Sequence, residues 1–205
     1  MFRKLIGGIL GGLVFFAWSS LAHTVLPLGG IGVREMPNEQ TVITAMQGLP
    51  DHGLYLFPGQ GLPENATQAQ KNAVMEQHFQ KIAASPSGLL VYHPARPVSF
   101  RRMLVTEAAT NILQLLLVAF LLGQAGLSSF GARWGFVTIA GFLAGISTNV
   151  SYWNWYGFPT NYTLVYAFTV VAGFVIAGLV VAAIVKPAEE MLSVIPKAQT
   201  RSAAR

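Results

Sequence analysis

Residues 103–123 decide the fold of this chain, and they read MLVTEAATNILQLLLVAFLLG. A helix of this length crosses the ~30 Å hydrocarbon core of a bilayer. Its first half nevertheless carries Glu107, Thr110, Asn111 and Gln114, whose spacing places them in one stripe on a helix. A carboxylate and amides are costly in lipid, so we expect this stripe to face protein or water.

The composition extends this prediction to the whole chain. Of its 205 residues, 53% are hydrophobic and only 10% are charged, whereas soluble proteins carry about a quarter charged residues. The net charge is +5, but no basic cluster is dense enough to grip phosphates, so we expect no nucleic-acid partner. The absence of cysteine excludes disulfides, thiolate metal ligands and cysteine nucleophiles.

Three further apolar runs complete the predicted architecture. They cover residues 5–28, 134–152 and 163–185. The fold class is therefore membrane all-α: four transmembrane helices with a small extracytoplasmic α/β insert between the first two. The predicted parts are a first helix in 1–28, the insert in 29–102, a three-helix region in 103–185 and a disordered cytoplasmic tail in 186–205.

The first run has a second interpretation. A basic start, an apolar stretch and Ser20-Leu21-Ala22 are also typical of a signal peptide covering residues 1–22. Cleavage there would expose His23 as a new N-terminus, whose amine and imidazole could bind copper. The apolar character continues to Leu28, which favours a retained helix.

Small residues mark the faces where the predicted helices pack. Glycines spaced by four residues allow helix backbones to approach closely in lipid. The glycines that we expect at such contacts are Gly8, Gly12, Gly135, Gly141, Gly145 and Gly173.

The insert has the pattern of a small α/β unit. Residues 53–58 and 88–94 read as strands and residues 63–84 as a helix, while Asn38 is placed to cap a shorter helix. Asn65-Ala66-Thr67 also matches a glycosylation sequon, a pattern common by chance. So few apolar residues make a weak core, and we expect the insert to rest on the membrane region.

The basic residues predict the orientation. Cytoplasmic loops favour Lys and Arg. With four spans, Arg3, Lys4, Arg133 and the basic tail fall on one side, so both termini are expected in the cytoplasm. The insert and the link 151–162 are then expected on the opposite, extracytoplasmic side of the membrane.

Polar and aromatic residues are expected to meet near the outer interface. His23 ends the first span, Glu107 begins the second, Asn149 ends the third, and an aromatic link follows. One interpretation is an outward-facing polar pocket for a small molecule, quinone or lipid, proton or metal. The other is a hydrogen-bonded knot that locks the helices together. The candidate ligand-binding residues are Glu107, Asn111, Gln114, His23, Asn149, Trp153 and Trp155.

Neither the aromatic link nor any catalytic or binding motif in the sequence indicates a particular chemistry. The run YWNWYGFP at 152–159 suits an aromatic belt at the membrane surface better than a wall for a quinone or lipid tail. The sequence contains no His-x-x-x-His, Gly-x-Ser-x-Gly or phosphate-cradling loop. We therefore assign no metal site, and the sequence identifies neither a cofactor nor a catalytic residue.

Three segments together carry a resemblance. The glycine-rich first span with Phe16-Ala17-Trp18 and Leu26-Pro27-Leu28, the run GLYLFP at 53–58 and the run YWNWYGFP at 152–159 resemble small multi-pass bacterial membrane proteins of unknown function. The resemblance covers most of the chain. It implies the bacterial inner membrane and nothing about catalysis.

Two functions are compatible with these features. The first is a non-catalytic subunit or partner-binding component of a membrane complex, associated with other membrane proteins or with copies of itself. The second is a ligand-handling membrane protein or enzyme that uses the polar pocket around Glu107.

Overall fold

The computed structural model describes residues 1–63 and 65–187. Within them the chain forms two compact units. The first comprises Met1–Val33, Ser99–Ser151 and the described residues from Pro159 onward; the second comprises Arg34–Val98 and Tyr152–Phe158. The predicted tail lies outside the described residues from position 188.

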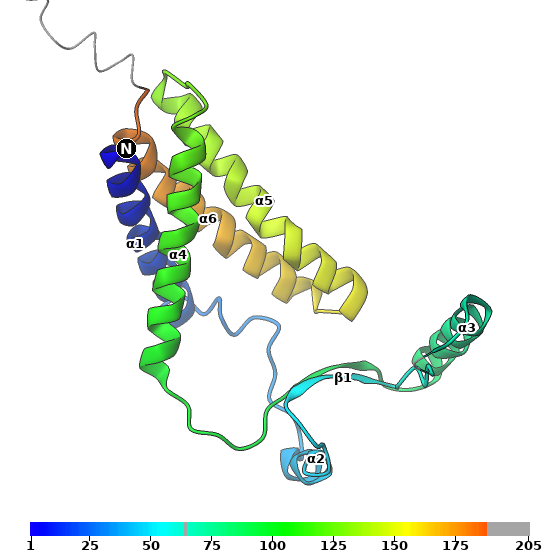
Figure 1. The fold of residues 1–205 in the computed structure, drawn as a ribbon. Coiled ribbons are helices and arrows are strands. Elements are labelled where there is room, and N and C mark those ends of the chain that lie inside the picture. The colour runs from blue at the N-terminus through cyan, green and yellow to red at the C-terminus, as the bar shows by residue number, and fades with distance from the viewer. Residues whose placement is uncertain (64, 188–205) are drawn as a thin grey trace, which may run out of the picture. The chain divides into compact units, whose positions relative to one another are not determined.

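Four long helices dominate the structure: α1 (Phe2–Thr24), α4 (Phe100–Leu122), α5 (Phe130–Tyr156) and α6 (Thr160–Ile184). Each is long and apolar enough to cross a membrane. They suggest a multi-pass membrane protein, and α1, α4 and α6 lie side by side in Figure 1.

The helix ends differ from the predicted ones because local signals start and stop the helices. The Ser99 hydroxyl accepts a 3.3 Å hydrogen bond from the Arg102 N–H, which caps α4 three residues earlier than predicted. Helix α5 continues through the aromatic run to Tyr156, which we had expected to be a turn. Gly157, with φ +68°, and Pro159 are the first residues that interrupt it.

Helix α1 packs between α4 and α6 along two rows of glycines. One row faces α4, where a Cβ on Gly12 would lie 2.8 Å from the Ile112 backbone nitrogen. The next row faces α6, where a Cβ on Gly11 would lie 2.5 Å from Val181 Cγ2. Close van der Waals contact of this kind is typical of helices that pack through small residues. The two rows consist of Gly7, Gly8, Gly11 and Gly12.

Glycines also set the distance between α5 and α6. A Cβ on Gly141 would lie 2.9 Å from Phe174 Cγ, and one on Gly145 would lie 3.2 Å from Val171 Cγ2. Gly135 differs from the other expected packing glycines, because among the described residues no atom beyond its own stretch of helix lies within 4 Å of its Cβ position.

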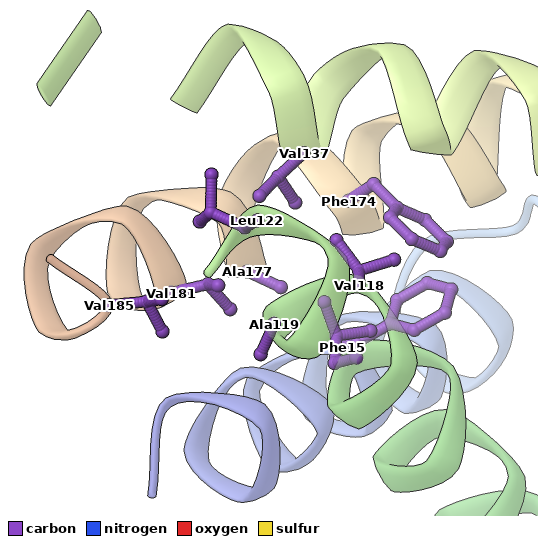
Figure 2. Packing of buried hydrophobic residues seen from close by; sticks show 10 residues of the cluster. Phe15, Val118, Ala119, Leu122, Val137, Phe174, Ala177, Val181 and Val185 are labelled. Carbon is purple, nitrogen blue, oxygen red and sulfur yellow. The ribbon is translucent and has the colours of Figure 1, made fainter. Parts of the chain in front are cut away.

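Buried apolar side chains from all four helices form the core of the first unit (Figure 2). The rings of Phe15 and Phe174 lie 5.2 Å apart, and Gly173 leaves room for Phe15 and Trp18. The Trp18 indole donates a 2.9 Å hydrogen bond to the Thr169 carbonyl. The residues drawn and labelled are Phe15, Val118, Ala119, Leu122, Val137, Phe174, Ala177, Val181 and Val185.

The second unit contains the predicted strands and helices. Strand β1 (Gly53–Phe57) pairs antiparallel with β2 (Gly88–Tyr92), and α3 (Gln68–Ala84) connects them. The shorter α2 (Glu39–Met46) follows Asn38, which occupies the N-cap position at φ 54° without a side-chain capping bond. Both strands, the helix between them and the short helix are therefore confirmed.

Candidate functional site

The polar stripe of α4 divides between the helix interface and the surface. Asn111 is only 2% exposed, and its Nδ2 makes no hydrogen bond to the described residues. Gln114 is half-buried, while Glu107 and Thr110 are exposed. The Thr110 hydroxyl donates to the Thr106 carbonyl 2.9 Å away, which satisfies it within its own helix.

A small cavity lies beside His23 at the end of α1. Its volume is about 70 Å³, room for roughly two water molecules. The His23 Nδ1 lies 2.8 Å from the Ser19 carbonyl, and Gly29 packs against the imidazole, because a Cβ there would lie 2.7 Å from His23 Cδ2. The lining residues are His23, Leu28, Gly29, Ile31, Tyr162, Val165, Tyr166 and Thr169.

Two tyrosines of α6 form part of the cavity wall. The Tyr162 and Tyr166 rings stack with centroids 5.9 Å apart, and both line the cavity. The charge of Glu107, on α4, contributes to the electrostatic environment of the Tyr166 hydroxyl, with a smaller effect than burial or Tyr162. His23 lines the cavity, whereas Glu107 is exposed on α4 and is not among the lining residues.

Sequence reasoning missed both tyrosines. We had assigned Tyr162 to the aromatic link, and Tyr166 lies inside an apolar run. Their i, i+4 spacing at the start of α6 was the available signal, since it places both phenols on one helix face.

Asn149 does not join this group through a hydrogen bond. Its Nδ2 donates to the Gly145 carbonyl 2.7 Å away, one turn back on α5. Trp153 and Trp155 are exposed and belong to the second unit. Of the predicted residues, His23 alone lines this cavity, while Glu107 is exposed on α4 and Asn111 is buried one turn further along that helix.

No match to a known protein adds to this geometry. Comparisons with protein-family models, curated proteins and solved structures found none for this chain. The function must therefore be argued from the residues themselves.

The side chains around this cavity are suited to binding a small polar group or a proton. An imidazole and two phenols can exchange hydrogen bonds and hold water. Elsewhere His52 and His93 stack with ring centroids 6.4 Å apart. Among residues 1–63 and 65–187, no three His, Asp or Glu side chains gather as metal ligands.

Proposed function

We propose that this chain is an integral protein of the bacterial inner membrane and a non-catalytic, partner-binding component of a membrane complex. Its termini lie in the cytoplasm and its second unit lies outside. The partners are other membrane protein subunits or further copies of the chain. The four apolar helices and the distribution of basic residues support the membrane assignment and the orientation.

One observation carries the partner-binding role: apolar side chains point out of the second unit. Leu54 and Val91 are direct partners across the two strands, and they are 68% and 61% exposed. Phe79 and Met75, one turn apart on α3, are also exposed. Neighbouring exposed apolar side chains typically mark a surface that another molecule covers.

Affinity purification from native membranes tests this role. The intact chain, Leu54→Glu, Phe79→Glu and the control Gln77→Glu are compared by the proteins that co-purify. Gln77 is exposed on the opposite side of α3 from Phe79, so the control adds the same charge elsewhere. We expect a specific protein to co-purify with the intact chain and with Gln77→Glu. This protein should no longer co-purify with Leu54→Glu or with Phe79→Glu. An unchanged set of proteins in all four preparations would refute the proposal.

The cavity beside His23 supports a second function, the handling of a small polar ligand or a proton. Its specific observation is that the imidazole of His23 and the phenols of Tyr162 and Tyr166 line one cavity. In this case Glu107 and His23 would act as polar contacts and Asn111 would position α4.

Replacing Glu107 by Gln separates the two functions, because the change removes the charge and keeps the shape. The ligand function predicts that assembly persists while binding or transport activity disappears. The structural interpretation predicts a lower thermal stability of the purified protein and intact activity. Glu76→Gln, on exposed α3, is the matched control.

A further inference from the structure

A larger cavity, of about 290 Å³, lies within the second unit. Leu56 and Leu89 are direct partners in the sheet, so both side chains point to the same face and form one wall. Ile82 of α3 adds a further apolar surface. The volume is at the lower end of the range for small-molecule sites, which start near ~300 Å³.

The strand ends provide the floor of this cavity. Phe57 and Gly88 are the last pair of the register, and both line the cavity. A Cβ at Gly88 would lie only 2.9 Å from the Phe57 ring. Glycine at this position therefore allows the ring to lie across the start of β2.

A short aromatic segment completes the lining. Tyr152 stacks on Phe158 with centroids 5.3 Å apart, and the Phe158 N–H donates to the Tyr152 carbonyl. These two contacts close the C-terminal end of α5, whose last turn carries Trp155 and Tyr156 to the cavity. Trp155 nevertheless remains 78% exposed, so its large ring lies at the mouth with most of its surface uncovered.

His78 is the polar group that sets the chemistry of the cavity. It is only 6% exposed, and its Nδ1 is enclosed without a hydrogen-bond partner among the described residues. An enclosed N–H without a partner is costly, so in the neutral imidazole the hydrogen belongs on Nε2. Nε2 is not enclosed, and no residue that the structure describes accepts a hydrogen bond from it. It is therefore a donor available to a bound molecule.

The lining excludes strongly charged molecules. It contains no Lys, Arg, Asp or Glu among the described residues, and its other hydrogen-bonding side chains are those of Ser87, Tyr156 and the indole of Trp155. An anion would find no cation, and a cation would find no carboxylate. Apolar walls, an uncovered indole and one imidazole donor suit a flat, uncharged ring that carries a hydrogen-bond acceptor.

We infer that this cavity binds an uncharged planar ring bearing a carbonyl group, of the quinone type, with the carbonyl accepting a hydrogen bond from His78 Nε2 and the ring packing on Trp155. The inference concerns binding alone. It does not assume a protein partner or a ligand beside His23, although Leu54 and Val91 of the partner surface lie on the same face of the sheet as Leu56 and Leu89.

Equilibrium dialysis of the full chain in lipid nanodiscs tests the inference, with empty nanodiscs as the background. The probe is 2-methyl-1,4-naphthoquinone, and 2-methylnaphthalene is the control that has the same ring without carbonyls. We expect saturable naphthoquinone binding that His78→Phe weakens about fivefold to tenfold, the loss of one hydrogen bond. Trp155→Ala should weaken the binding of both probes, whereas His78→Phe should leave the binding of 2-methylnaphthalene unchanged.

A second measurement covers the case in which His78→Phe does not fold. In the intact chain labelled with ¹⁵N-histidine, naphthoquinone should shift the Nε2 resonance of one histidine and the naphthalene should not. Binding no greater than to empty nanodiscs, equal affinity of the intact chain and His78→Phe, or an unmoved Nε2 resonance would each overturn the inference.

Discussion

Arg133 brings a positive charge into the buried part of the first unit, where it is only 4% exposed. Its Nε donates to the Ala182 carbonyl at 2.9 Å, and its Nη1 donates to the carbonyls of Leu127 and Ser128. The side chain thereby joins the end of α6 to the connection between α4 and α5. A buried charge is tolerated when it is hydrogen-bonded in this way.

Replacing Arg133 by Met should therefore destabilise the protein, because it leaves buried carbonyls without a donor. We expect a loss of about 2–3 kcal/mol in the free energy of unfolding, measured by denaturant titration of the purified protein in detergent. Arg102→Met is the control, since that side chain is exposed. Equal stability of the two variants would contradict the structural role of Arg133.

Two glycines provide a matched test of helix packing. A methyl group on Gly12 would meet the backbone of α4, which cannot move aside as a side chain can. Gly12→Ala should cost roughly 1–3 kcal/mol. Gly135→Ala adds the same methyl group in open space, so stability should be unchanged or rise by up to about 1 kcal/mol. Parallel unfolding titrations check the difference, and a Gly12→Ala protein as stable as Gly135→Ala would refute the α1–α4 contact.

Helix α3 shows how a local signal defines an element. Its predicted start was residue 63, but it begins at Gln68 because Thr67 and Gln70 form a capping box. The Thr67 N–H donates to Gln70 Oε1 at 2.9 Å, and the Gln70 N–H donates back to the Thr67 hydroxyl at 3.3 Å. The capping box therefore accounts for the threonine at position 67, and the glycosylation sequon is not needed to explain it.

Thr67→Ala should loosen the first turn of α3 and leave the first unit unaffected. Loss of a helix cap lowers the stability of the helix by about 1 kcal/mol. Where amide exchange requires local opening of the helix, this loss makes exchange roughly fivefold faster. Hydrogen-exchange mass spectrometry of residues 68–72 measures this effect. Thr44→Ala is the control, since the exposed Thr44 hydroxyl only bonds back to Gln40 within α2. Unchanged exchange in α3 would show that the box does not stabilise the helix.

At the scale of the molecule, the testable property is the orientation in the membrane. The chain has no cysteine, so single cysteines can be placed without background. We expect Gln77→Cys, in the second unit, to react with an impermeant maleimide in intact spheroplasts. Gln124→Cys, between α4 and α5, should react only after permeabilisation. Labelling of both positions from the same side would exclude the proposed topology.

Local patterns in the sequence predict which segments are apolar helices and which are strands, because periodicity and helix-breaking residues are local properties. The sequence also indicated Glu107 and His23 as polar residues near one end of their spans. The sequence could not show that Gly141 lies in a helix contact and Gly135 does not, because two glycines differ in this respect only through the residues that pack against them.

Only the tertiary structure decided which side chains meet. It brought Tyr166 and His23 to one cavity, buried Asn111 while leaving Glu107 exposed, and joined the aromatic segment 152–158 to the strands of the second unit. It also enclosed one nitrogen of His78, a residue that looks unremarkable along α3. These outcomes depend on contacts between residues far apart in the chain. Such contacts produce no periodic pattern in the sequence of the segments that make them.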